Sequence, residues 1–226
     1  MGATGFAYDI ATQFGMRVTG TRPALVPFTF SDGRFAEISG VSLPVRVQAG
    51  AGVFDEAMLF THRGLSGPAI LQISSYWAEG ADITLNLTPD GTTMTALRDQ
   101  RQISGRRYFK TELATHLPAR LVDHLAQDLD LTGNLADWSD ARLSTLFDKL
   151  QNWSLRPSGS EGYRTAEVTF GGIATEEVSS KSMMSKRVQG LYIVGEAMDV
   201  TGWLGGYNFQ WAWSSGMAAA RDIMAV

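Results

Sequence analysis

The sequence contains no cysteine and only three histidines among its 226 residues. The lack of cysteine excludes disulfide bonds, iron–sulfur clusters, thiolate zinc sites and a cysteine nucleophile. His116 and His124 are about two helical turns apart, too far to chelate one metal ion together. We therefore assign no metal site to this chain.

The chain also lacks an excess of basic residues, and its formal net charge is −4. Binding to a phosphate backbone needs basic surface, so we expect no nucleic acid as a partner. No basic region followed by an apolar run is present at the start, which argues against a signal peptide, and a cytoplasmic location is the simplest expectation. The uncharged stretch between Val200 and Ala220 contains Asn208, Gln210 and several glycines, so we expect no membrane partner.

Hydrophobic residues make up 44% of the chain and charged residues 19%, which is ordinary for a globular protein. The most distinctive stretch is the last one. Leu191–Val194 is an apolar run that predicts a buried strand, a loop with three glycines follows, and residues 207–224 predict a helix that is buried all round. A strand, a glycine-rich turn and a helix can direct free backbone N–H groups and a helix dipole at an anionic or polar ligand.

The rest of the chain predicts a mixture of strands and helices. A short helix is expected from Phe6, with Gly15 at its end, and the helical stretch 92–153 is expected to break at Pro118. Pro23 and Pro27 exclude a central, fully paired strand there. Strand-like segments in a meander or small barrel, and a helix at 69–77, are also expected; the strand segments are 35–38, 43–48, 53–61, 82–87 and 166–170.

Two clusters could carry chemistry. His62 lies in a tight loop with an arginine and a serine, but no second histidine or acid is near it in sequence to form a triad. A basic cluster between residues 98 and 110 could hold a phosphate, although a solvated helix face is the interpretation that its pattern favours. The basic residues are Arg98, Arg101, Arg106, Arg107 and Lys110.

Four stretches of the chain agree with one known family, in the same order. They are residues 4–27 with Thr4-Gly5, residues 60–69 (Phe-Thr-His-Arg-Gly-Leu-Ser-Gly-Pro-Ala), residues 168–186 with Val-Thr-Phe-Gly-Gly-Ile, and residues 190–216 with Gly195-Glu196 and Gly-Gly-Tyr-Asn. In these stretches the chain resembles the BaiN-like (YhiN-like) flavoproteins. These are NAD(P)/FAD-dependent oxidoreductases of the two-dinucleotide-binding-domain superfamily.

The resemblance implies an α+β or α/β fold, in which an FAD-binding Rossmann-type domain is interrupted by an insert domain that is part β-barrel and part helical. Residues 1–21 and 163–226 would belong to the FAD domain, and residues 22–162 to the insert, which is a possible substrate domain. The implied activity is hydride transfer through FAD, with NAD(P)H as a possible reductant and an unknown substrate.

The resemblance also implies which residues contact the cofactor. The terminal helix would face the pyrimidine edge of the flavin, where its dipole stabilises negative charge, and Asn208 and Gln210 could donate hydrogen bonds to that edge. It assigns no catalytic acid, and His62 is an outside candidate whose loop could reach the flavin. The implied cofactor-binding residues are Gly195, Glu196, Asp199, Gly205, Gly206, Tyr207, Asn208 and Gln210.

One departure from the family pattern is large. The chain has no Gly-x-Gly-x-x-Gly turn near its start and no ribose-binding acid about twenty residues after one. We therefore expect a truncated form that lacks the N-terminal Rossmann half, about 150 residues. The alternative is a non-catalytic remnant or protein-interaction module that does not retain FAD. In a broken FAD domain, the 191–194 segment and the terminal helix would expose an apolar patch.

Overall fold

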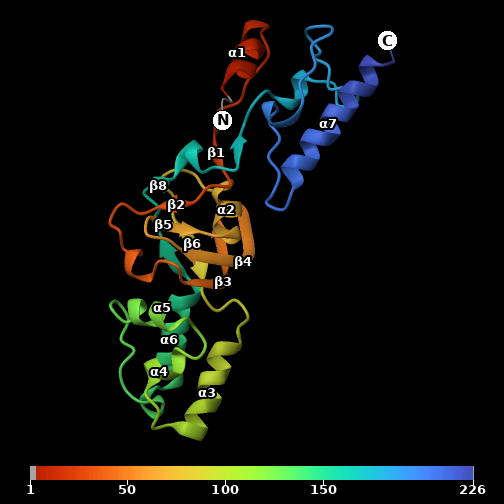
Figure 1. Ribbon diagram of the computed structural model, residues 1–226. Helices are drawn as coiled ribbons and strands as arrows, with labels where there is room; N and C mark the ends of the chain where they lie inside the picture. The colour runs from red at the N-terminus through yellow and green to blue at the C-terminus, as the bar shows by residue number, and fades with distance from the viewer. Residues whose placement is uncertain (1–3, 226) are drawn as a thin grey trace. The chain divides into compact units, whose positions relative to one another are not determined.

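The computed structural model describes residues 4–225, and it divides into two compact units (Figure 1). The central unit spans residues 27–161, and the terminal unit combines the residues before 27 with those from 162 onward. The fold is a mixed α+β one with seven α-helices and antiparallel sheets among the described residues. The two compact units meet between residues 26 and 27 and between residues 161 and 162. The domain boundaries expected from the sequence, at 21/22 and 162/163, stay a prediction.

A seven-stranded antiparallel sheet forms one side of the central unit. Its strand order is β7-β6-β3-β4-β5-β2-β8. The strands are β2 (Phe28–Thr29), β3 (Ser42–Ala49), β4 (Gly52–Phe60), β5 (Gly64–Ser66), β6 (Ile83–Asn86), β7 (Trp153–Leu155) and β8 (Gly159–Ser160). The β3–β4 hairpin is the longest pairing, and β3 alternates buried and exposed side chains along its whole length. Strands β3 and β4 confirm the strands predicted at 43–48 and 53–61.

Helices cover and extend this sheet. They are α2 (Pro68–Ser74), α3 (Thr92–Ser104), α4 (Phe109–Leu113), α5 (Ala119–Leu125) and α6 (Asp140–Gln151). Pro68 begins α2 at the position where a missing N–H costs nothing, one residue before the helix expected at 69–77, and Pro118 precedes α5, where the sequence predicts a break. The strand expected at 35–38 is wrong: Ala36–Ile38 is a 3₁₀-helix. Phe35 and Ile38 are both buried at a spacing of three, which a helical turn allows and a strand does not.

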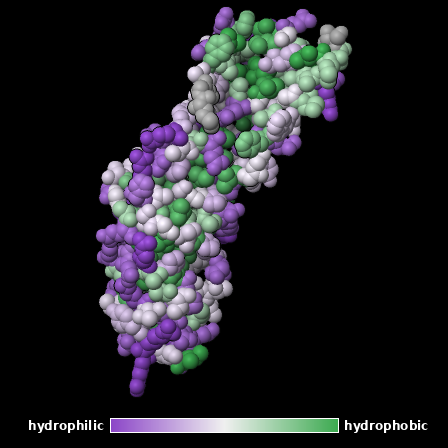
Figure 2. Space-filling model, viewed as in Figure 1, coloured by the Kyte–Doolittle hydropathy of each residue, from purple (hydrophilic) through white to green (hydrophobic). Residues whose placement is uncertain are grey.

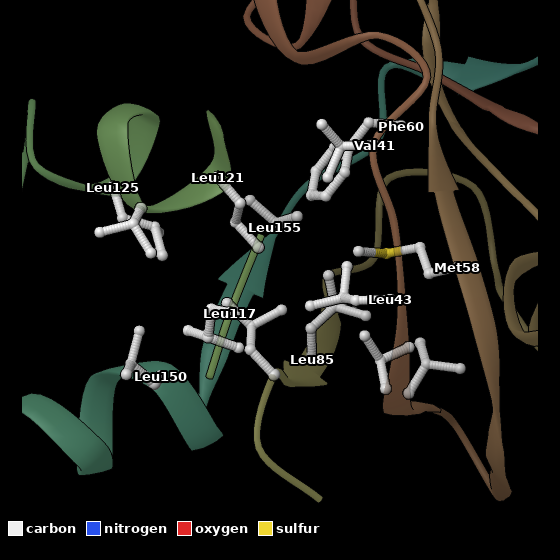
Figure 3. Close-up of a cluster of buried hydrophobic side chains, with 14 of the residues drawn as sticks. Val41, Leu43, Met58, Phe60, Leu85, Leu117, Leu121, Leu125, Leu150 and Leu155 are labelled. Carbon is white, nitrogen blue, oxygen red and sulfur yellow. The ribbon is translucent and has the colours of Figure 1, made fainter. Parts of the chain in front are cut away.

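The sheet and the helices share one hydrophobic core. Figure 3 shows side chains of the sheet, such as Leu43, Met58 and Leu85, gathered with Leu121 of α5 and Leu150 of α6. Phe109 and Trp138 stack with their ring centroids 3.6 Å apart, deeper in the helical part. The strands and helices of this unit therefore stabilise one another rather than forming separate cores.

Because the core is shared, shortening one of its buried side chains should lower the stability of the whole central unit. Leu121 is completely buried, so Leu121→Ala removes buried apolar surface and leaves a cavity, at a cost of about 2–5 kcal/mol in the free energy of unfolding. Ile103→Ala is the matched control because Ile103 is 77% exposed on α3, and it should change stability by less than about 0.5 kcal/mol. Urea unfolding followed by tryptophan fluorescence checks both, and equal destabilisation would contradict the shared core.

The terminal unit contains less regular structure. Its elements are α1 (Phe6–Gln13), β1 (Arg22–Ala24), β9 (Val168–Phe170) and α7 (Tyr207–Ile223), with 3₁₀-helices at Gly162–Arg164, Thr175–Glu177 and Gly195–Ala197. Strands β1 and β9 form a two-stranded antiparallel sheet. The small core of this unit consists of Ala11, Met16, Ile173, Val178, Met183, Ile193, Met198 and Ala219.

Two expectations for the terminal unit are wrong in this structure. Residues 191–194 do not form a strand, because Tyr192 makes only an isolated bridge to Met184 and a strand needs a neighbour along its length. Helix α7 is not buried all round: only Ser215 and Ala219 are buried, and large side chains such as Phe209 and Trp213 are exposed. In Figure 2 hydrophobic residues are plainly visible on the surface of this unit. The apolar surface expected on the 191–194 segment and the terminal helix is exposed on the helix, whereas within 191–194 only Val194 is exposed.

No helix formed by the described residues combines the length and the hydrophobicity that crossing a bilayer requires.

Candidate functional site

The glycine-rich loop before α7 is held in shape by one side chain. Asn208 closes a ring with the backbone of Gly202: its Oδ1 accepts from the Gly202 N–H at 2.8 Å, and its Nδ2 donates to the Gly202 carbonyl at 3.1 Å. A Cβ at Gly202 would lie 2.8 Å from the Cβ of Tyr207, so only glycine fits there. The side-chain amide of Asn208, expected at the flavin edge, is therefore already engaged within the loop.

The N-terminus of α7 carries no side-chain cap. Gly206 is the N-cap residue, with φ of 92°, and Gly205 before it has φ of 113°. Both angles lie in the region that favours glycine, and glycine leaves the first-turn N–H groups uncovered. The positive end of a 17-residue helix therefore faces outward at this loop, which is the arrangement that binds anionic or electron-rich groups.

Gly195 connects the preceding segment to α7. Its N–H donates to Ser215 Oγ at 2.9 Å, and its carbonyl accepts from Trp211 Nε1 at 3.0 Å. Its φ is 63°, and a Cβ there would lie 3.7 Å from Ala212 Cβ. The Gly195 backbone is thus held on α7, in a conformation that a side chain rarely adopts.

The two carboxylates of the site are oriented by other segments of the terminal unit. Glu196 Oε1 accepts from the Thr169 N–H of β9 at 2.6 Å, and Asp199 Oδ2 accepts from Thr19 Oγ1 at 3.0 Å. The pKa of Tyr8 is raised, first by burial and then by the negative charge of Glu196. Both acids therefore hold together the segments around the loop.

Gln210 differs from its neighbours because its side chain is exposed. Its Nε2 donates to Ser214 Oγ, one turn further along α7, at 2.9 Å. The amide lies on the first turn of the helix and can rotate without breaking a contact to another segment. It is the predicted site residue best placed to change partners.

Thr201 is a residue that the sequence patterns do not single out. Its Oγ1 is buried and has no hydrogen-bond partner among the described residues. A buried hydroxyl without a partner costs about 1–3 kcal/mol, so Thr201 Oγ1 beside the glycine-rich loop is available to hydrogen-bond a ligand. In the sequence, Thr201 is marked only by its place directly before Gly202, within a stretch that has no charged residue.

His62 belongs to the central unit, whereas the glycine-rich loop and α7 belong to the terminal unit. It is exposed in the turn between β4 and β5, where the Gly64 N–H donates to Thr61 Oγ1 at 3.0 Å. A Cβ at Gly64 would lie 2.3 Å from the Phe28 carbonyl oxygen, so the turn requires glycine. Within the described part of the chain, no three acidic or histidine side chains are grouped as a metal ion would require.

A buried carboxylate connects three segments that support the site. Glu177 accepts from the Arg17 N–H at 3.2 Å and from Arg187 Nε at 2.5 Å, and its own carbonyl accepts from the Lys186 N–H at 2.9 Å. The pKa of Glu177 is lowered, first by its hydrogen bond with Arg187 and then by the Arg17 N–H. The folded state therefore favours the ionised carboxylate.

This lowered pKa predicts how stability depends on pH. A carboxylate whose pKa is lower in the folded state stabilises the fold above its ordinary pKa of 4.5, and that contribution disappears as pH falls through the folded value. Glu177→Gln should therefore lower the melting temperature at pH 7, and its difference from the wild type should shrink below pH 4.5. Glu167→Gln, the same change at an exposed residue of this unit, is the control. A deficit that is constant with pH would contradict the role of the charge.

Comparison with known proteins agrees with this architecture. The family model for the HI0933-like protein barrel and H2TH domain matches residues 22–168. The chain belongs to the HI0933-like family. This confirms the predicted superfamily, whereas the closer assignment to BaiN-like proteins is not confirmed.

Three curated relatives align with nearly the whole chain. The chain is 50% identical to the ribosomal RNA dihydrouridine synthase of Escherichia coli (strain K12), over 100% of the chain and 58% of the relative. It is 47% identical to the protein of the same name from Haemophilus influenzae, over 99% of the chain and 57% of the relative. It is 30% identical to the 3-dehydro-bile acid delta(4,6)-reductase of Clostridium scindens, over 98% of the chain and 58% of the relative. The chain thus spans somewhat more than half the length of these relatives.

Proposed function

We propose that this chain is part of a flavin-dependent oxidoreductase that reduces a carbon–carbon double bond, and that its substrate is uridine in ribosomal RNA. The observation that carries the proposal is the 50% identity, over the whole chain, to a ribosomal RNA dihydrouridine synthase. The 30% identity to a bile acid reductase supports the reaction type but favours a different substrate, and we choose the substrate that the names of the more similar relatives give.

The residues around α7 fit one edge of a flavin, and we propose FAD as the cofactor. The uncapped helix N-terminus, the glycines at 202, 205 and 206 and the unpaired Thr201 hydroxyl together offer hydrogen-bond donors to a planar, electron-rich group. When bound, the flavin supplies hydride transfer, with NAD(P)H as the source of reducing equivalents. The chain's own part is to donate hydrogen bonds at Gln210 and the first turn of α7, and to stabilise negative charge there. The acids Glu196 and Asp199 keep the surrounding segments in place.

An RNA substrate runs against the expectation, drawn from net charge, that nucleic acid is not a partner. That expectation stays a prediction, because net charge describes the whole chain and phosphate contacts depend on local charge.

The exposed face of α7 favours a second candidate, a protein-interaction module that does not retain FAD. Phe209 is 77% exposed and Trp213 is 76% exposed, and Tyr207 and Met217 are exposed beside them on the same helix. Exposed aromatic side chains at helical spacing are typical of a surface that a protein partner covers.

A flavin titration and a reduction assay separate these two functions. The purified chain should take up FAD, with the visible bands of bound flavin and a higher melting temperature, because a ligand that binds only the folded state stabilises it. With NADPH and unmodified ribosomal RNA, nucleoside mass spectrometry should then detect dihydrouridine. A colourless chain that is indifferent to FAD would favour the interaction module. FAD uptake without dihydrouridine, but with reduction of a steroid enone, would favour the alternative substrate.

The Gln210 side chain offers a finer test of the flavin edge. Gln210→Ala removes one hydrogen-bond donor and should weaken FAD binding about fivefold, the effect of one hydrogen bond of about 1 kcal/mol. Ser214→Ala is the matched control because it removes the same Gln210–Ser214 hydrogen bond but leaves the amide in place. Titration of FAD quenching measures both affinities. An equal loss in the two variants would show that the hydrogen bond is structural and that Gln210 does not contact the flavin.

A further inference from the structure

The basic cluster at the end of α3 is not explained by the candidate cofactor site. Between residues 98 and 110 there are five basic residues and one acidic residue. Ion pairs neutralise part of this positive charge. Arg98 and Arg101 share Asp140, at 3.4 and 2.9 Å, and other carboxylates pair with Arg107 and Lys110. Since one carboxylate serves two arginines, positive charge remains in excess.

Arg106 is the residue that these ion pairs leave out. Among the arginines of the central unit, all of which are described, Arg106 alone has neither an ion pair nor a side-chain hydrogen bond. It is exposed. By contrast, Arg46 on the β3–β4 hairpin is paired with Asp55 at 2.7 Å through a two-point contact, so that surface is locally neutral.

The turn that carries Arg106 also exposes an aromatic ring. Tyr108 is 44% exposed, and Ile103, at the end of α3, is 77% exposed. An arginine and an aromatic side chain two residues apart provide the two contacts that single-stranded nucleic acid uses, a phosphate contact and a base-stacking surface. An acidic protein segment could pair with the arginine, but unlike RNA it has no base to stack on the exposed Tyr108 ring.

The backbone of this turn is rigid. The Leu135 N–H donates to the Arg107 carbonyl at 2.8 Å, and the Ala136 N–H donates to the Gly105 carbonyl at 2.9 Å. The Phe109 N–H donates to the Gly133 carbonyl at 3.0 Å, and the Phe109 ring stacks on Trp138 in the core. Arg106 and Tyr108 therefore project from a fixed backbone, which lowers the entropic cost of binding.

We propose that the α3–α4 turn, residues 103–110, binds single-stranded RNA, with a phosphate at Arg106 and a base stacked on Tyr108. Arg107 and Lys110 keep their ion pairs with Glu112 and Asp123, so the excess positive charge comes from Arg106 and from the two arginines that share Asp140. The choice of RNA as the polyanion rests on the proposed function. The turn would hold a segment of the substrate RNA.

Fluorescence anisotropy of a labelled RNA tests this surface without flavin or NADPH. The probe is a single-stranded RNA of about 20 nucleotides and mixed sequence, titrated with the 226-residue chain at several salt concentrations. Arg106→Gln should weaken binding severalfold at low salt and reduce the slope of log K against log salt by about 0.7, the value for one phosphate contact on a single strand. Tyr108→Ala should weaken binding about tenfold, and Tyr108→Phe should retain it, because stacking needs the ring and not the hydroxyl.

Arg46→Gln is the matched control. It makes the same change in net charge at an exposed arginine of the same unit and should leave both affinity and salt slope nearly unchanged. Melting temperatures of all variants confirm that each one folds. The proposal is overturned if the wild-type chain does not bind the probe at low salt, if Arg46→Gln weakens binding as much as Arg106→Gln, or if Tyr108→Ala binds like the wild type.

The outcomes separate this surface from the proposed function. RNA binding that depends on Arg106 and Tyr108, in a chain that takes up no FAD and forms no dihydrouridine, supports the surface and contradicts the proposed activity. Dihydrouridine formation with unchanged RNA affinity in both variants supports the activity and overturns the surface. A duplex RNA of the same sequence that binds more tightly than the single strand, with no effect of Tyr108→Ala, also overturns the proposed stacking.

Discussion

The attachment of Gly195 to α7 is the interaction on which the candidate site depends. The backbone N–H and carbonyl of this one residue are held by Ser215 and by the Trp211 indole of the same helix. Gly195 begins the segment that contains Glu196, Asp199 and Thr201. This contact therefore fixes the position of that segment along the axis of α7. The Asn208–Gly202 ring then fixes the far end of the loop at the first turn of the helix. The loop is therefore fixed at both ends to one helix, and a ligand would meet an ordered surface.

Most polar residues predicted for the site already have partners within the terminal unit. Glu196 and Asp199 bond to other segments and Asn208 bonds to the backbone of its own loop, which is what a purely structural role requires. The groups that remain available are the N–H groups at the start of α7, the exposed amide of Gln210 and the buried hydroxyl of Thr201. The site is thus better described as a shaped backbone surface with few side-chain donors. A helix terminus can stabilise charge in this way because its dipole needs no side chain.

Local patterns predicted most of the central unit but not the surroundings of α7. The β3–β4 hairpin, the helix that begins at Pro68 and the break at Pro118 follow from alternation and proline chemistry, which are local. Whether α7 is buried depends on what packs against it, and composition alone suggested burial where Phe209 and Trp213 are exposed. The same limit applies to residues 191–194, which are apolar enough for a covered strand but have only one bridge, to Met184. Glycines of the site could be found from spacing and family resemblance, whereas Thr201 emerges only from its unpaired hydroxyl.

Charge shows the same difference between local and global information. A net charge of −4 describes a chain in which most exposed arginines are neutralised by a nearby carboxylate, as Arg46 is by Asp55. Around the α3–α4 turn the pairing is incomplete, because Asp140 is shared and Arg106 has no carboxylate. The attraction between exposed charges falls off within about 10 Å at ordinary salt, so a polyanion would respond to this turn and not to the whole chain. An acidic protein can therefore present an RNA-binding surface where an unpaired arginine lies on a hydrogen-bonded turn beside an exposed aromatic ring.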